Sequence, residues 1–149
     1  MIQATTETAF IIYVQTEDNR INTSVASTQI RHLVKFTNDL DKSVYYAYAA
    51  TEIIKNRFTT ITIGYNINPN IYNGTTKLFP AGYYKYEIYE VSWIGTVTIS
   101  GGNAPATEDD VLSPAADTKG IVQGLVTKGK MNLSEKDGTQ QVQYTQREA

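Results

Sequence analysis

The sequence predicts an all-β protein that folds as a β-sandwich of about seven to eight short strands. Three observations support this fold class. The chain is rich in threonine, isoleucine, valine and tyrosine, which favour strands over helices. Short segments of alternating apolar and polar residues are separated by turn residues. No segment carries a convincing helical period, and 149 residues suit one domain better than two.

The most informative pattern is FPAGYYKYEIYEV, from Phe79 to Val91. Its residues alternate between two faces after a Pro-Ala-Gly turn, as in a half-buried strand. Gly82 can adopt a positive φ angle at little cost, and Tyr84 follows it by two residues. In immunoglobulin-type sandwiches a tyrosine two residues before the second core cysteine turns its hydroxyl back to the preceding corner. Tyr86 stands where that cysteine would be, so Gly82, Tyr84 and Tyr86 predict a tyrosine corner in an immunoglobulin-like sandwich without a disulfide.

Two strands are predicted in the first 37 residues, well before this corner. From Thr8 to Gln15 apolar residues occupy both alternating faces, which predicts a strand buried on one side and partly covered on the other. A polar surface connection follows, and the second strand runs from Gln29 to Thr37. His32, the only histidine, lies on its apolar face without a nearby catalytic partner, which favours a core or interfacial role.

A β-hairpin and a further strand are predicted next. The residues Asn38 to Asp41 can bond their own backbone two residues on, and a strand from Val44 to Glu52 follows this turn. A helix over Tyr45 to Lys55 is the alternative, because the stretch contains good helix formers, although it lacks a clear cap. Phe58 to Tyr65 alternates threonine with isoleucine, both branched at Cβ, and is the least ambiguous strand.

The last part of the chain contains a long acidic segment between strands. Trp93 to Ser100 is predicted as a strand. Residues 101–119 then contain glycine, proline, alanine and four acidic side chains, which predicts a flexible acidic loop or arm. Gly124 to Leu133 is the next strand, with Leu125 and Met131 on one face. Lys-Asp-Gly at 136–138 predicts a hairpin turn before a short strand at 140–145, and residues 146–149 should fray.

Composition excludes several function classes. The 13 basic and 15 acidic residues are balanced, and the basic ones are scattered, so we expect no nucleic-acid partner. No segment approaches the roughly 20 apolar residues that span a bilayer, and the start of the chain lacks the features of a secretory signal, so we expect no membrane association. The absence of cysteine rules out disulfides, thiolate metal sites and a cysteine nucleophile.

The sequence predicts neither an enzyme nor a cofactor or metal site. The carboxylates Asp39 and Asp41, and those of residues 108–110, do not have the spacing of a calcium loop. Gly101 and Gly102 lack the residues that complete a phosphate-binding loop. Tyrosine, by contrast, is enriched in protein interfaces. The candidate interface residues are Tyr83, Lys85 and Tyr89 on the outward face of the corner strand, and Glu108, Asp109 and Asp110 in the acidic loop.

Four segments together form a recurrent pattern: FTND (Phe36–Asp39), the pair Arg57-Phe58 before a strand, PAGYYKYEIYE (Pro80–Glu90) and GLVTKGKMNL (Gly124–Leu133) after an acidic linker. This pattern resembles small virion proteins of tailed bacteriophages, particularly crAss-like and related environmental phages. In those chains an F-T-N-D strand end, a GxYxYxIYE strand and a late GxLxV strand recur. The resemblance covers residues 30–133, and its motifs are structural.

The resemblance implies an immunoglobulin-like sandwich that assembles on the phage particle as an auxiliary or decoration protein of the capsid. Its partners would be the major capsid protein or other virion proteins, with self-association as a further option, and no catalytic residue carries over. A cysteine-free chain suits assembly in the reducing cytoplasm of the host. A portal- or tail-associated structural role is the first alternative. The second is a glycan or host-surface binding module on a fibre, with Trp93, Tyr89 and Tyr72 as stacking rings.

The acidic loop is where this sequence departs from the pattern. The sequence leaves open whether this segment is an arm that reaches a neighbouring subunit. Residues 1–149 are expected to form a single β-sandwich domain.

Overall fold

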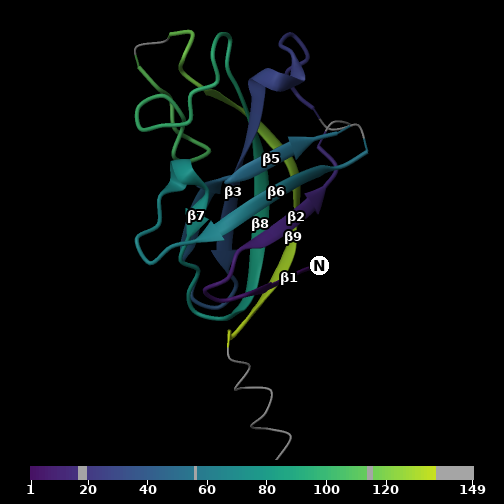
Figure 1. Cartoon of the computed structure of the whole chain (residues 1–149), viewed down its shortest axis with the longest axis vertical. Helices are drawn as coiled ribbons and strands as arrows, with labels where there is room; N and C mark the ends of the chain where they lie inside the picture. The colour runs from purple at the N-terminus through teal and green to yellow at the C-terminus, as the bar shows by residue number, and fades with distance from the viewer. Residues whose placement is uncertain (17–19, 56, 114–115, 137–149) are drawn as a thin grey trace, which may run out of the picture.

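The computed structural model describes residues 1–16, 20–55, 57–113 and 116–136. Within these ranges the protein is all-β, with nine strands in two sheets and two single-turn 3₁₀ helices. Figure 1 shows one sheet lying in front of the other. The predicted fold class, an all-β sandwich, is therefore confirmed.

The larger sheet contains β1 (Ile2–Thr5), β3 (Ile30–Asn38), β4 (Val44–Tyr48), β8 (Gly82–Ser92) and β9 (Ile121–Ser134). Its order is β1-β9-β8-β3-β4. All neighbouring strands run antiparallel except β1 and β9, which are parallel. β8 therefore lies at the centre and pairs along its length with β3 on one side and β9 on the other.

The smaller sheet contains β2 (Phe10–Val14), β6 (Thr59–Tyr65) and β5 (Thr51–Ile54), in this order, and β7 (Thr75–Thr76) pairs with β6. The 3₁₀ turns are η1 (Ser27–Gln29), just before β3, and η2 (Ile71–Asn73), just before β7. The strands predicted over 8–15, 29–37 and 58–65 correspond to β2, β3 and β6.

The main hydrophobic core fills the space between the two sheets. Each sheet contributes residues that are completely shielded from solvent, among them Phe36 and Ile88 from the larger sheet and Ile12 and Ile61 from the smaller one. Phe10 meets Phe36 edge to face across this space, with ring centroids 5.9 Å apart. Full burial of one such side chain stabilises the fold by about 1.5–3 kcal/mol.

A second, smaller core lies on the outer side of the larger sheet. Leu33 and Tyr48 face each other across β3 and β4 on this side, and both are completely buried. They are covered by the connection between β8 and β9, which contributes Trp93 and Ala104. Figure 1 shows this connection, in green, at one end of the molecule. At this end the larger sheet is buried on both faces.

This second core explains why the strand predicted over Trp93–Ser100 is wrong. These residues form a loop that pairs with no strand. Val97 and Ile99 alternate with threonine because they pack against the second core, not because they belong to a pleated ladder. Trp93 is completely buried there, and its Nε1 donates a hydrogen bond to the Thr118 carbonyl oxygen at 3.1 Å.

The segment predicted as one strand from Val44 to Glu52 forms two strands, β4 and β5, which belong to different sheets. The chain crosses from one sheet to the other at residues 49–50, where the backbone amide of Ala50 donates to the Thr62 carbonyl at 2.7 Å. The helix considered for residues 45–55 is not formed. The turn before β4 follows the prediction, because Asn38 Oδ1 accepts hydrogen bonds from the amides of Leu40 and Asp41.

The strand predicted over Gly124–Leu133 is present within β9, but one side-chain assignment is wrong. Met131 and Leu133 are buried, whereas Leu125 is exposed and Val126 is buried instead. The pairing of β9 with β8 shifts register next to Val126, and such a β-bulge reverses the direction of the side chains beyond it. The turn, short strand and frayed end predicted after residue 136 lie outside the described residues.

His32 is a buried structural residue that links the two sheets. Its Nδ1 lies 2.6 Å from Oε2 of Glu52 on β5, and the two side chains are 2% and 4% exposed. The backbone amide of His32 also donates to Oε1 of Glu52 at 3.2 Å. The histidine therefore holds β5 against β3, as the core interpretation expects.

Tyr84 makes the hydrogen bond that a tyrosine corner requires. Its hydroxyl donates to the carbonyl oxygen of Pro80 at 2.7 Å, and its ring is completely buried. Gly82, two residues earlier, has a φ angle of +138°, which side chains rarely adopt. Tyr86 is half-buried at the edge of the main core and lies against Gly129 of β9, where an added Cβ would come within 2.5 Å of the hydroxyl.

The corner hydrogen bond can be tested with Tyr84→Phe. The variant keeps the buried ring and loses the hydrogen bond to Pro80, so we expect the free energy of unfolding to fall by about 1 kcal/mol or more. Tyr83→Phe is the matched control, because this neighbouring ring is 55% exposed. Urea denaturation followed by far-UV circular dichroism measures both. Equal stability of the two variants would contradict a role for the corner.

Candidate protein interfaces

The outer face of the larger sheet carries the sequence-predicted tyrosine and lysine residues. Tyr83, Lys85 and Tyr89 alternate on this face of β8, as the strand pattern predicts. Tyr83 and Lys85 lie on its open half, where Lys85 sits between Thr37 of β3 and Lys130 of β9. The Lys130 ammonium donates to the Asp39 carboxylate at 2.6 Å. The Lys85 ammonium lies 3.6 Å from the Glu87 carboxylate, so the open half is a charged surface with opposite charges close together.

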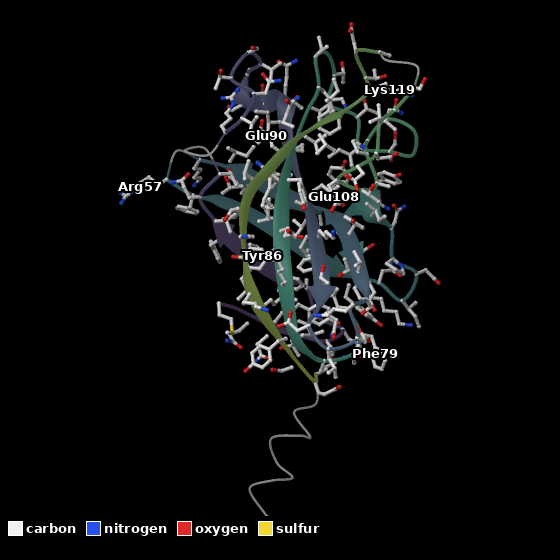
Figure 2. All side chains as sticks on the ribbon, turned by 180° about the vertical axis from the view of Figure 1, so that it is seen from behind. Arg57, Phe79, Tyr86, Glu90, Glu108 and Lys119 are labelled. Carbon is white, nitrogen blue, oxygen red and sulfur yellow. The ribbon has the colours of Figure 1, made fainter. Side chains whose placement is uncertain are left out.

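Glu108 anchors the acidic loop to this same sheet. Its Oε2 lies 2.7 Å from the Lys35 ammonium on β3, and its Oε1 accepts a hydrogen bond from the Tyr46 hydroxyl on β4. Nearby, the Tyr48 hydroxyl donates to the Pro105 carbonyl at 2.5 Å. Within residues 101–119, which the sequence predicts to be a flexible loop or arm, Ala104, Pro105 and Glu108 contact the protein's own sheet; Glu108 is labelled in Figure 2.

These contacts shift the protonation of all three groups. Burial alone would raise the pKa of Glu108, but the hydrogen bonds from Lys35 and Tyr46 lower this pKa below its usual value. The hydrogen bond to Glu108 raises the pKa of Lys35. Burial, followed by the hydrogen bond to Glu108, raises the pKa of Tyr46. The carboxylate and the ammonium therefore both favour their charged forms, and the phenol favours its neutral donor form.

The structure brings Tyr89 and Glu108 near each other, although they are 19 positions apart in the chain. Tyr89 is half-buried under the loop, where burial and then the carboxylates of Glu87 and Glu108 raise its pKa to about 12. Asp109 and Asp110 lie further along the loop. They line a hollow of about 470 Å³ between the loop and the start of β9, together with apolar residues such as Ile94 and Ile121. Tyr89 therefore lies near Glu108, which lines the hollow together with Asp109 and Asp110, whereas Tyr83 and Lys85 lie on the open half of the sheet.

The aromatic rings considered for glycan stacking are largely inside the protein. Trp93 is completely buried, and Tyr72 and Tyr89 pack against the second core. Tyr72 stacks on Tyr48, with ring centroids 6.4 Å apart. These rings serve the fold by joining the loops to the larger sheet.

The outer face of the smaller sheet is an open apolar surface that the sequence analysis missed. Outward residues form two rows across β2, β6 and β5: Ile11, Thr62 and Thr51 in one, and Tyr13, Thr60 and Ile53 in the other. Phe58 flanks the second row, with its ring centroid 6.2 Å from that of Tyr13. The exposed fractions of the large side chains are 46% for Ile11, 64% for Tyr13, 49% for Ile53 and 40% for Phe58.

We call these seven residues the uncharged face. None of them is ionisable at neutral pH, and all lie within the described ranges. The nearest cations stand at one end of the face, where the Lys55 ammonium lies 5.9 Å from the Phe58 ring centroid and Arg57 projects from the margin of the molecule (Figure 2). The signal in the sequence was the continuous apolar run FIIYV in β2, which places large apolar residues on both sides of one strand.

Glu90 is a further residue whose role the sequence analysis did not predict. Its side chain is completely buried on β8, and its two carboxylate oxygens accept hydrogen bonds from the backbone amides of Ile21 and Asn22, at 3.0 and 2.7 Å. Asn22 also donates to Ser92 Oγ at 3.2 Å. Glu90 therefore fixes the connection between β2 and β3 on the sheet, in a structural role.

The anchoring of the acidic loop predicts a pH dependence. The pKa of Glu108 is lowered in the folded protein, so its contribution to stability is complete above the ordinary value of 4.5 and is lost as the pH falls through the lower folded value. Glu108→Gln should destabilise the docked loop by about 1–2 kcal/mol at neutral pH and reduce this acid dependence. Trp93, the only tryptophan, lies under the loop and reports its release as a red shift in fluorescence.

Asp109→Asn is the matched control for this experiment. Asp109 neighbours Glu108 but makes no hydrogen bond or ion pair with a described residue. Urea unfolding of both variants is measured by Trp93 emission at several pH values from 3 to 7. Identical urea midpoints for the two variants would show that Glu108 does not hold the loop.

The described part of the chain contains no group of three His, Cys, Asp or Glu side chains placed to hold a metal ion. No helix in that part is long and apolar enough to cross a bilayer. Neither a protein-family model, nor a curated protein, nor a solved structure matches the chain.

Proposed function

We propose that this protein is a non-enzymatic structural protein that joins a larger assembly by binding another protein chain through its uncharged face. The observation that carries the proposal is the contrast between the two outer sheet faces. The larger sheet is covered by the chain's own loop at one end and is charged at the other. The smaller sheet leaves four large apolar side chains partly exposed on one face, with the threonines of β6 between those of β2 and β5.

An open surface of this kind favours association. Burying apolar surface stabilises a complex by about 25 cal/mol per Å². Contiguous exposed apolar patches are uncommon on monomeric proteins and mark interaction sites. Tyr13 is well suited to such contacts, because tyrosine offers a large contact area and loses little conformational entropy.

The arrangement of the strands supports an immunoglobulin-type sandwich. In that fold one sheet contains strands C, F and G, extended by C′ in the variable type, and the other contains B, E and D. Here β4-β3-β8-β9 follow the order C′-C-F-G, and β2-β6-β5 follow B-E-D. The tyrosine corner also lies at the start of β8, the strand in the place of F.

The resemblance to phage virion proteins supports the identity of the assembly. Three of the segments that carry it form the end of β3 and most of β8 and β9, which are the central strands of the larger sheet. We propose that the assembly is the virion of a tailed bacteriophage and that the protein decorates the capsid. A position at the portal or tail is the alternative within the same proposal.

Quantitative mass spectrometry of purified virions tests this function. We expect the chain to be present in virions of the phage that encodes it, in numbers comparable with the major capsid protein. A copy number that matches a single ring would place it at the portal or tail. Absence from purified particles would overturn the virion proposal.

A further inference from the structure

We propose that the partner of the uncharged face is a second copy of this chain, which makes the protein a symmetric dimer packed sheet to sheet. This inference rests on the proposed function, in which that face binds protein. The seven residues of the face lie on β2, β5 and β6 and on the residue before β6.

The first argument is the chemistry of the face. Its two rows contain only isoleucine, threonine, tyrosine and phenylalanine side chains, so it offers no ionic group to a charged partner. A fitting partner must present an uncharged, apolar surface of similar width. In a two-fold symmetric interface the same patch meets itself, so no like charges oppose each other here. The chain thus supplies a matching surface of its own.

The second argument is shape. The central strand β6 presents the small side chains of Thr60 and Thr62, whereas the flanking strands present larger ones, Tyr13 on β2 and Ile53 on β5. In this row the face is a shallow trough between two ridges, and in the other row β5 presents the small side chain of Thr51. Packed sheets interdigitate their side chains at a separation of about 10 Å. With a two-fold axis perpendicular to the strands, each strand faces its own counterpart and the row of Ile53 meets the row of Thr51. On β5 the larger side chain of one copy therefore lies over the smaller one of the other.

The third argument is area. At their exposed fractions, Ile11, Tyr13, Ile53 and Phe58 leave roughly 400 Å² of surface open, taking about 200 Å² for each free side chain. Two faces therefore contribute roughly 800 Å² from these side chains alone, and the threonines add to it, against roughly 1,200 Å² for the smallest stable interfaces. The dimer is of the weak class, and its population depends on concentration.

The charged rim selects the orientation of the two copies. Lys55 and Arg57 stand together at one end of the face. If the strands of the two copies ran parallel across the interface, these cations would meet their own symmetry mates. An antiparallel arrangement separates them by the length of the strands. The dimer therefore has its two-fold axis between the faces and perpendicular to the strands.

Sedimentation velocity over a wide range of protein concentration tests the dimer. We expect the wild-type mass to rise from 16.6 kDa towards twice that value with concentration. Tyr13→Lys and Ile53→Lys place a charge on the face and should weaken association about tenfold or more. Tyr83→Lys is the matched control, since Tyr83 is similarly exposed on the other sheet. Circular dichroism confirms that each variant is folded.

Single-cysteine variants test the orientation, because the natural chain has no cysteine. A short bis-maleimide should join two copies of Thr60→Cys or Thr62→Cys, near the axis, and should not join two copies of Arg57→Cys, at the rim. Efficient cross-linking through Arg57→Cys would overturn the antiparallel arrangement. A wild-type protein that stays monomeric, or equal weakening by Tyr13→Lys and Tyr83→Lys, would overturn the dimer.

A parallel measurement separates this inference from the proposed function. Wild-type protein and the Tyr13→Lys variant are mixed with particles that lack the chain and are sedimented. If the wild type is monomeric but only Tyr13→Lys fails to co-sediment, the second-copy inference is wrong and the proposed function stands. If the wild type dimerises through this face but neither protein co-sediments, the dimer stands and attachment to the particle is wrong.

Discussion

The pairing of β8 with two neighbours is the constraint on which the rest of the structure depends. Because β8 is hydrogen-bonded to β3 and β9 along its length, its register fixes which residues of all three strands face each side of the larger sheet. Tyr84 and Ile88 are thereby directed into the main core, and Tyr89 and Val91 towards the second core. The corner at Pro80 fixes where this register begins. The buried carboxylate of Glu90 attaches the connection between β2 and β3 to β8.

The two sheets differ in how their apolar outer residues are shielded from water. The larger sheet has apolar residues on both faces, and the long connection between β8 and β9 covers those of the outer face at one end. This connection is held by the Lys35–Glu108 ion pair and the Tyr48–Pro105 hydrogen bond. Among the described residues no segment covers the outer face of the smaller sheet in this way, and the outward residues of its strands are uncharged. Pro105 and Glu108 thus attach the acidic segment to the larger sheet, whereas the smaller sheet presents an open apolar face to another molecule.

Local spacing predicted the features that depend on a few neighbouring residues: the alternation of β6, the Asn38 turn and the arrangement of Gly82 and Tyr84. Features that depend on distant partners were not predictable. Lys35 and Glu108 are 73 residues apart, and nothing in either segment identifies the other as its partner. The bulge that buries Val126 and exposes Leu125 depends on pairing with β8. The apolar alternation after Trp93 looks the same in a strand as in a loop that covers a sheet. The solvent exposure of Tyr13 likewise depends on which face of each sheet another segment covers.

The parallel pairing of β1 with β9 has a mechanical consequence. Residues 2–5 lie beside residues 131–134 and run in the same direction. A tensile force that enters through the start of β1 and leaves through the end of β9 pulls the two strands past each other along their length. All hydrogen bonds between them then bear the load together, in shear, whereas an antiparallel pair pulled from its open end would separate one bond at a time. The fold therefore resists stretching along this axis better than peeling of its outer strands.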